Sequence, residues 1–141
     1  GTRAYHMALF TVMETGTQML ADSPTQYYKN PDCTKFLTQV PCTWDETRAI
    51  EAKFGEYLII AKRHGSKWFV AGICNNKVEA RHHKVPLDFL ADGNHKMTIV
   101  TDGFNAAKQA MDYRMETKTV GKGDVLDITM VRNGGFTAII E

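Results

Sequence analysis

The sequence predicts a mainly β protein, an antiparallel β-sandwich of about eight short strands preceded by an N-terminal helical segment. Two observations carry this prediction. After Trp44 the chain divides into short apolar segments separated by Gly, Asn and Asp, with no helical pattern between them. Before Trp44, residues 4–20 have helical spacing with apolar side chains on nearly every side. Such a helix must be buried all round, and a small β-domain covers only one face of it.

The helical segment is expected to hold two helices. Thr2 is a candidate N-cap for the first helix, and Asp22-Ser23-Pro24 would end it. Asn30 and Pro31 have the residue types that begin a helix, so a second, short helix is expected from there to Gln39. This second helix would connect the first helix to the strands.

The expected strands follow one another through short turns. His64-Gly65-Ser66 predicts a tight hairpin, and Asn133-Gly134-Gly135 predicts the turn before the last strand. Trp68 alternates with Val70 inside a strand, which favours packing in the core. The predicted strands are residues 43–50, 56–63, 67–73, 79–85, 95–101, 114–120, 124–131 and 136–140.

Composition excludes several classes of function. A chain of 141 residues makes one domain, or one domain with an appendage. Its formal net charge is +1 and it has no basic block, so neither nucleic acid nor an anionic membrane is implied. No apolar run reaches the roughly 18 residues of a membrane-spanning helix. The three cysteines cannot form a complete disulfide framework, and whether Cys33 and Cys42 pair stays open.

No catalytic or metal-binding constellation is visible. Asp45 and Glu46 are adjacent carboxylates, and glycosidases use paired carboxylates, but neighbours in a strand point to opposite faces. His82 and His83 are separated in the same way, so exposed structural histidines are expected. Neither the histidines nor the cysteines have the spacing of a zinc site. The sequence therefore predicts no catalytic residue, no metal site and no cofactor in this chain.

Two groups of side chains are candidates for binding. Tyr27 and Tyr28 in the connector, together with Trp44, could stack on sugar rings as aromatic residues do in carbohydrate-binding modules. Met7, Phe10 and Met13 mark one apolar stripe of the first helix. We expect this stripe to be a docking surface through which the chain self-associates, since the β-domain leaves it uncovered.

Several short motifs, in the same order along the chain, resemble the C-terminal part of glycoside hydrolase family 97. The motifs are Gly1-Thr2-Arg3-Ala4, Met19-Leu20-Ala21-Asp22-Ser23-Pro24, Thr43-Trp44-Asp45-Glu46-Thr47, Gly55-Glu56-Tyr57 with Ala61-Lys62-Arg63, Trp68-Phe69-Val70-Ala71-Gly72 and Gly134-Gly135-Phe136. The first residue is Gly and no signal peptide is recognisable, which favours a start inside a longer protein.

The resemblance implies a multidomain enzyme that acts on α-glucosidic or α-galactosidic bonds, with an N-terminal β-sandwich, a central (β/α) barrel and a C-terminal β-sandwich. Residues 1–24 would be the last barrel helix and residues 25–45 a connector, so that residues 1–45 precede a C-terminal sandwich of residues 46–141. In this family that sandwich is linked to oligomer contacts. The catalytic carboxylates and calcium ligands lie upstream and none maps onto this chain. The family also implies a periplasmic or cell-envelope location in a Gram-negative bacterium.

Two functions follow from these observations. The first is a non-catalytic domain of a family 97 enzyme, which packs against the upstream barrel and forms homo-oligomers. The alternative is a carbohydrate-binding module, favoured by Tyr27, Tyr28 and Trp44. A self-contained small enzyme would need a paired acid and base, which the sequence lacks.

Overall fold

The computed structural model describes residues 1–13, 31–103, 106 and 112–141, and this part of the chain is mainly β, as predicted. Its helices are α1 (Arg3–Val12) and α4 (Pro31–Leu37). Its strands are β1 (Glu46–Lys53), β2 (Tyr57–His64), β3 (Lys67–Cys74), β4 (Ala80–Pro86), β5 (His95–Asp102), β6 (Tyr113–Val120), β7 (Val125–Val131) and β8 (Gly135–Ile140).

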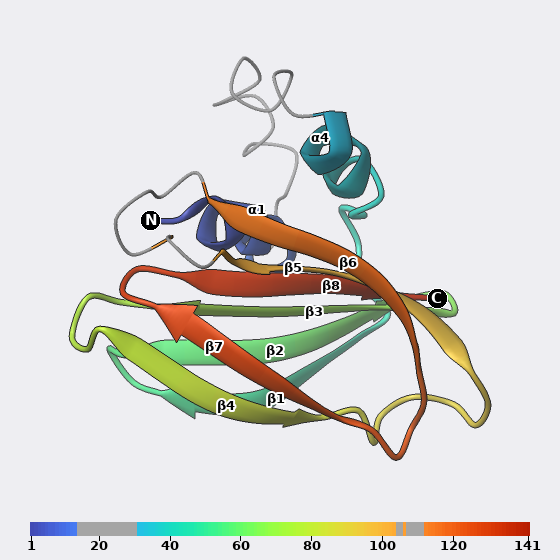
Figure 1. Ribbon diagram of the computed structural model, residues 1–141. Coiled ribbons are helices and arrows are strands. Elements are labelled where there is room, and N and C mark those ends of the chain that lie inside the picture. Colours follow the sequence, from blue (N-terminus) through green and yellow to red (C-terminus); the bar gives the residue numbers. More distant parts are fainter. Residues whose placement is uncertain (14–30, 104–105, 107–111) are drawn as a thin grey trace.

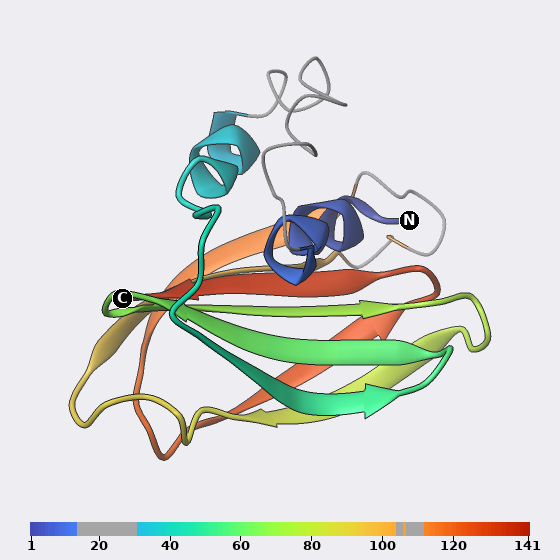
Figure 2. The same cartoon turned by 180° about the vertical axis from the view of Figure 1, so that it is seen from behind.

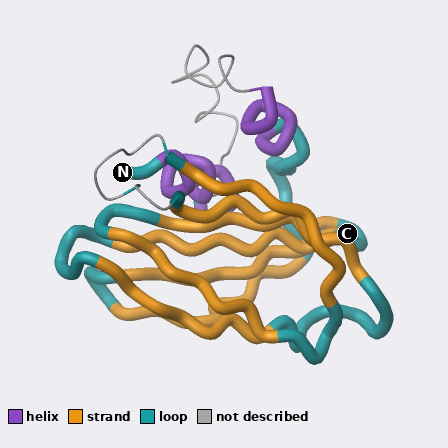
Figure 3. The backbone as a smooth tube through the Cα atoms, in the orientation of Figure 1, coloured by secondary structure: helices purple, strands orange, loops and turns teal. Residues whose placement is uncertain are grey.

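The strands form two antiparallel sheets. The larger sheet has six strands in the order β1-β2-β3-β8-β5-β6, and the smaller sheet pairs β4 with β7. The last strand, β8, therefore lies near the middle of the larger sheet, between β3 and β5. The β4–β7 pair covers one face of the larger sheet, and the two helices lie on the other face (Figures 1 and 2). Strands make up most of the described backbone, as the tube in Figure 3 shows.

The inner face of the larger sheet, which meets β4 and β7, carries the main core. Alternate residues of each strand point into it, because side chains of a strand alternate between faces. Trp68 is buried here, as its alternation with Val70 predicted. The core includes Ile59, Ala61, Trp68, Val70, Val85, Leu87, Leu90, Met97, Ile99, Leu126, Ile128, Met130, Phe136, Ala138 and Ile140.

The outer face is covered by the helices. α1 begins at the predicted N-cap, where the Thr2 side chain accepts a hydrogen bond of 3.1 Å from the backbone N–H of Tyr5. It packs across β3, β8 and β5. α4 starts at Pro31, as expected, and contributes buried apolar side chains to a second cluster on this face. That cluster comprises Ala4, Met7, Phe10, Cys33, Phe36, Leu37, Phe69, Val100 and Ile139.

The predicted bounds of the first strand and of both helices are wrong in part: the strand runs to Lys53 rather than residue 50, and the second helix ends at Leu37 rather than Gln39. The first strand begins at Glu46 rather than residue 43, because Asp45 serves another element: its Oδ2 accepts a hydrogen bond of 2.7 Å from the N–H of Gly65 in the β2–β3 turn. The first helix ends at Val12, where Met13 takes an extended backbone, so the helix does not continue unbroken to residue 20. Residues 14–30, with Asn30 and the Asp22–Pro24 stop signal, lie outside the described residues.

β1 carries an irregularity in its pairing with β2. Ala49 lies opposite Ile60 and Glu51 lies opposite Ile59, so Ile50 is an extra residue in the ladder. A bulge of this kind shifts the alternation of side chains by one position. As a result, side chains before and after the bulge that would face opposite sides of a regular strand share one face.

Candidate interaction surface

The predicted docking stripe of α1 is mostly inside the protein, which corrects the expectation. Met7 has 0% and Phe10 has 2% of their surface exposed, and both belong to the cluster with Phe69 on the outer face of the sheet. Only Met13 is exposed, at 46%. Met7 and Phe10 therefore hold α1 on its own sheet and cannot meet a second copy without undocking the helix.

The opposite side of α1 is only partly covered. Tyr5, Leu9 and Val12 are half-buried and His6 is exposed. With Met13 they form a row along a side of the helix that the sheet covers only in part. The expectation that the β-domain covers only one face of this helix is therefore confirmed, but the uncovered face is a different one from the predicted stripe.

The predicted sugar-binding aromatics give no stacking platform in the described residues. Trp44 is half-buried and packs edge-on against Phe69, with ring centroids 5.3 Å apart at 71°. The ammonium of Lys62 lies 5.2 Å from the centroid of the same indole ring. Neighbouring side chains thus already contact the Trp44 ring. Tyr27 and Tyr28 lie outside the described residues.

The outer face of the sheet is open over β1 and β2, on the flank of α1. Two hollows lie along this flank. One, of about 450 Å³, is lined by Tyr5, Ala52, Phe54, Leu58 and Ile73, among others. The other, of about 500 Å³, includes Val12, Trp44, Thr47, Ile60 and Lys62. A third hollow of the outer face, of about 510 Å³, lies between α4 and the strands β5 and β6.

Phe54, at the tip of the β1–β2 hairpin, was not singled out from the sequence. It is fully exposed, with a relative exposure of 104%. Its neighbour Gly55 has a positive φ of 74°, which a Gly tolerates without strain. A large aromatic residue beside a turn glycine was the available signal, because folding alone gives no reason to place an apolar ring at a hairpin tip.

A polar cluster joins the two sheets behind β1. The hydroxyl of Tyr57 donates a hydrogen bond of 2.7 Å to Glu51, and His83 Nδ1 lies 3.5 Å from the other Glu51 oxygen. The hydrogen bond to Glu51 raises the pKa of Tyr57. Arg81 adds an ion pair of 2.9 Å with Glu56, whose pKa is lowered by its bonds to Lys53 and Arg81.

His82 and His83 do point to opposite sides of β4, as predicted. His82 is exposed, whereas His83 is 8% exposed and stacks near Tyr57, with ring centroids 4.6 Å apart. The prediction of exposed structural histidines is therefore wrong for His83. Its position is determined by β1 and β2, which are distant from it in sequence.

Asp102 at the end of β5 ties three segments together. One of its carboxylate oxygens accepts from the Thr2 hydroxyl at 2.6 Å, and the other accepts from the backbone N–H of Val131 at 2.9 Å and of Gly135 at 3.2 Å. Burial raises the pKa of Asp102, and these hydrogen bonds oppose that effect. Asp102 thus fastens the start of α1 to the β7–β8 turn, a structural role.

The carboxylates and possible metal ligands among the described residues are not grouped as a catalytic site would need. Asp45 and Glu46, which were expected to point apart, both approach Arg63, at 3.9 Å and 3.4 Å. They do so because Asp45 precedes the strand. No group of three or more His, Cys, Asp or Glu side chains in the described ranges could hold a metal ion.

Cys33 and Cys42 are not joined by a disulfide bond. No helix among the described residues is long and apolar enough to cross a membrane.

Curated relatives match the chain along all or nearly all of its length. A retaining alpha-galactosidase of Bacteroides thetaiotaomicron is 36% identical over 141 residues, which is 100% of this chain and 21% of that protein. A probable retaining alpha-galactosidase of Streptomyces bingchenggensis is 33% identical over 136 residues, covering 96% of this chain and 20% of that protein. The chain thus spans about a fifth of the length of these relatives.

Solved structures show the same fold. A glycoside hydrolase family 97 enzyme from Pseudoalteromonas sp. strain K8, in complex with acarbose, matches with a TM-score of 0.84 at 24% identity and covers 99% of this chain and 22% of that one. The family model described as glycosyl-hydrolase 97 C-terminal, oligomerisation, matches residues 43–141. On this match and the identity to the curated relatives, the chain belongs to the C-terminal oligomerisation domain family of glycoside hydrolase 97.

Proposed function

We propose that this chain is the non-catalytic C-terminal domain of a family 97 glycoside hydrolase, which packs against an upstream barrel and brings copies of the enzyme together. The observation that carries this proposal is the match of residues 43–141 to a C-terminal domain family described by oligomerisation. The names of the two curated relatives favour a parent that hydrolyses α-galactosidic bonds with retention of configuration. A calcium-dependent parent and a periplasmic or cell-envelope location are parts of the proposal that rest on family resemblance.

The surroundings of the acidic side chains support a role without catalysis. Hydrolysis of a glycosidic bond needs two carboxyl groups that flank one open site. Here Glu46 binds Arg48 and Arg63, and Glu51 binds Tyr57 beside His83. These carboxylates are engaged with neighbouring side chains rather than facing a shared cleft.

The environment of Trp44 weighs against the alternative, a carbohydrate-binding module. A sugar ring stacks on an aromatic face that is open to solvent. The edge-on contact with Phe69 and the nearby Lys62 ammonium already occupy the surroundings of this ring. Oligomerisation is therefore the better supported function.

Three measurements on the purified chain test the proposal. Incubation with p-nitrophenyl α-galactoside and α-glucoside should release no nitrophenol, and turnover that tracks with the pure protein would overturn the non-catalytic assignment. Light scattering should give a mass above the 15.9 kDa of one chain as concentration rises. Calorimetric titration with galactosides and malto-oligosaccharides should show no heat of binding at millimolar sugar, whereas saturable binding would favour the carbohydrate-binding alternative.

A further inference from the structure

β1 is a free edge of the six-stranded sheet. It pairs with β2 on one side and stands at the end of the strand order. The views in Figures 1 and 2 place it along the rim of that sheet. Thr47, Ala49 and Ala52 are exposed. A free edge offers unpaired backbone N–H and C=O groups to a strand from another chain.

The charges of β1 are complementary to those of a second β1 that runs antiparallel to it. Two copies of Glu46–Lys53 can be placed side by side and antiparallel, with their ends matched, across a two-fold axis. Glu46 of one copy then lies opposite Lys53 of the other. In the same alignment, Arg48 lies opposite Glu51. The two-fold axis repeats each of these attractive pairs. Opposite charges directly across an antiparallel pair stabilise it.

The bulge at Ile50 makes this alignment sterically consistent. Side chains directly opposite each other in an antiparallel pair must lie on the same face of the sheet. On β2 the partners of Glu46, Arg48, Glu51 and Lys53 are Arg63, Ala61, Ile59 and Tyr57, all alternate residues that share the inner face. Without the extra residue, the charges before and after the bulge would face opposite sides. With it, every charge in the alignment meets its partner on one face.

The same alignment gives Phe54 a place to bind. Phe54 follows Lys53 in the β1–β2 turn, so in this alignment it lies at the Asp45 end of the second copy, beside the hollow of about 500 Å³ that includes Val12, Trp44 and Ile60. The exposed ring and this hollow lie at opposite ends of β1, as a two-fold contact requires, because each copy then supplies one ring and one hollow. Burying the ring should tighten association by about ten- to a hundredfold.

The ion pairs that β1 makes within one chain do not prevent its charged side chains from pairing with those of a second copy. Glu46 binds Arg48 and Arg63, and Lys53 binds Glu56 at 2.9 Å. The side chains of Arg48 and Lys53 are 54% and 63% exposed. Exposed ion pairs contribute little and rearrange at small cost.

We propose that β1 is the contact strand of a homodimer, in which two copies join their six-stranded sheets edge to edge through antiparallel β1–β1 pairing, with Phe54 of each copy in the Trp44 hollow of the other. The proposal rests on the oligomerisation function proposed above and assigns it a surface.

Charge reversal on β1 tests the proposal with the full chain. Glu46→Lys alone places a lysine opposite Lys53, and Lys53→Glu alone places a glutamate opposite Glu46. Each variant should therefore dimerise at least about tenfold more weakly than the unmodified chain.

An equimolar mixture of the two variants should recover dimers. In the mixed dimer the two introduced side chains face each other at one end of the strand pair, and the native Lys53 and Glu46 face each other at the other end. Both contacts therefore join a lysine to a glutamate, as in the unmodified dimer. Sedimentation velocity with one variant fluorescently labelled measures this recovery.

The matched control is Lys118→Glu on β6, the opposite edge of the same sheet, which should leave dimerisation unchanged. Phe54→Ala should weaken dimerisation while circular dichroism stays that of the unmodified chain. If the unmodified chain stays monomeric at every concentration, the proposed oligomerisation function fails. If it forms dimers that neither single reversal weakens, or if the mixture does not recover them, the β1 assignment alone is overturned.

Discussion

The two faces of the six-stranded sheet are covered to different extents. The inner face is closed by β4 and β7 over a continuous core, with Phe136 and Met97 fully buried. The outer face is covered by α1 over β3, β8 and β5, with α4 beside it, but lies open over β1 and β2 and at a hollow between α4, β5 and β6. The difference indicates that the inner face stabilises the fold, whereas part of the outer face is available for contacts outside the chain.

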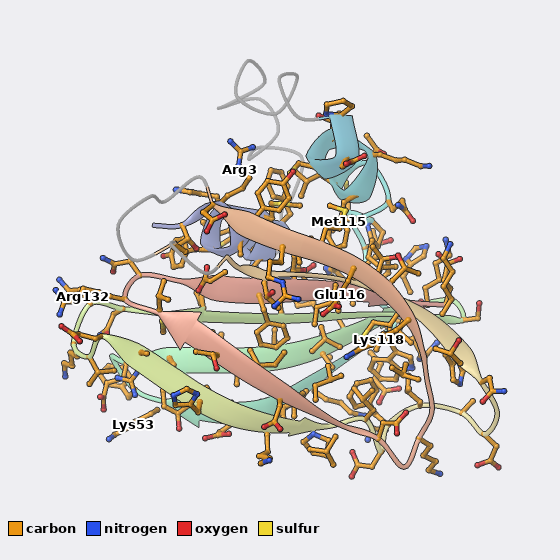
Figure 4. The ribbon with its side chains drawn as sticks, in the orientation of Figure 1. Arg3, Lys53, Met115, Glu116, Lys118 and Arg132 are labelled. Carbon is orange, nitrogen blue, oxygen red and sulfur yellow. The ribbon has the colours of Figure 1, made fainter. Side chains whose placement is uncertain are left out.

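The two edge strands of the sheet, β1 and β6, also differ in how available they are for contacts outside the chain. β6 carries Arg114, Glu116 and Lys118 on its inner face, beside a polar gap of about 210 Å³ shared with β7. Figure 4 shows Glu116 and Lys118 along this part of β6. Charges that point inward protect an edge strand from pairing with another chain. The charges of β1 also lie on the inner face, and what distinguishes them is that their order matches that of a second antiparallel copy.

The largest expected effect is the loss of a ring from the closed face. Phe136→Ala should lower the free energy of unfolding by about 3–5 kcal/mol, because it opens a cavity in a core with no freedom to collapse. Urea unfolding monitored by Trp fluorescence measures the change. Met7→Ala, the matched deletion under α1, should cost about 2–3 kcal/mol, since a single helix can shift to fill the space. Equal costs at both positions would contradict the difference between the faces.

Asp102 should give the fold a pH dependence at the junction of α1 and the β7–β8 turn. Burial raises its pKa in the folded protein above the ordinary value of 3.8. At pH values between the ordinary pKa and the raised pKa of Asp102, the folded state binds more protons than the unfolded state. The free energy of unfolding therefore falls as pH rises through this range. Asp102→Asn keeps an acceptor oxygen but removes the charge, and should abolish this slope in urea unfolding measured from pH 3 to 7. An unchanged slope in the variant would show that other carboxyl groups cause it.

The contact between α4 and β6 should be sensitive to alkaline pH. The hydrogen bond between Tyr113 and Cys33 raises the pKa of Tyr113 to about 12, with burial as the second cause. The stability that this contact contributes is complete below the ordinary tyrosine pKa of 10 and is lost as the pH rises towards 12. Tyr113→Phe should cost about 1 kcal/mol at pH 7 and remove the alkaline loss. Absorbance titration at 295 nm of the unmodified chain should show one tyrosine ionising late.

The smallest expected effect on stability is at the open flank. Phe54→Ala should change the free energy of unfolding by less than about 0.5 kcal/mol, because the ring is fully exposed in the single chain. Chemical unfolding should be measured at a concentration too low for association. A large loss there would mean that Phe54 serves the fold and not an interface.

Much of the fold was predictable because its signals are local. Alternation located the strand that buries Trp68, and the turn residues located the hairpins at Gly65 and at Asn133, which takes a positive φ of 55°. The start of β1 was missed because Asp45 is drawn to the N–H of Gly65, a tertiary contact. A helix with apolar residues on both sides does not reveal which side meets the sheet, so Met7 and Phe10 were assigned to a docking surface.

The interaction surface was less predictable because it depends on pairing between distant segments. The charge pattern of β1 matches a second copy only once the bulge at Ile50 places all its charges on one face, and the bulge is defined by the register with β2. The burial of His83 likewise depends on Glu51 and Tyr57 from other strands.

Amide hydrogen exchange measured at two protein concentrations tests the central claim most directly. At a concentration well above that needed for association, amides of Glu46–Lys53 in β1 should become more protected than in dilute solution, because new backbone hydrogen bonds form along that edge. Amides of Tyr113–Val120 in β6 should exchange at the same rate at both concentrations. Protection that rises in β6, or that fails to rise in β1 while the chain associates, would contradict the account.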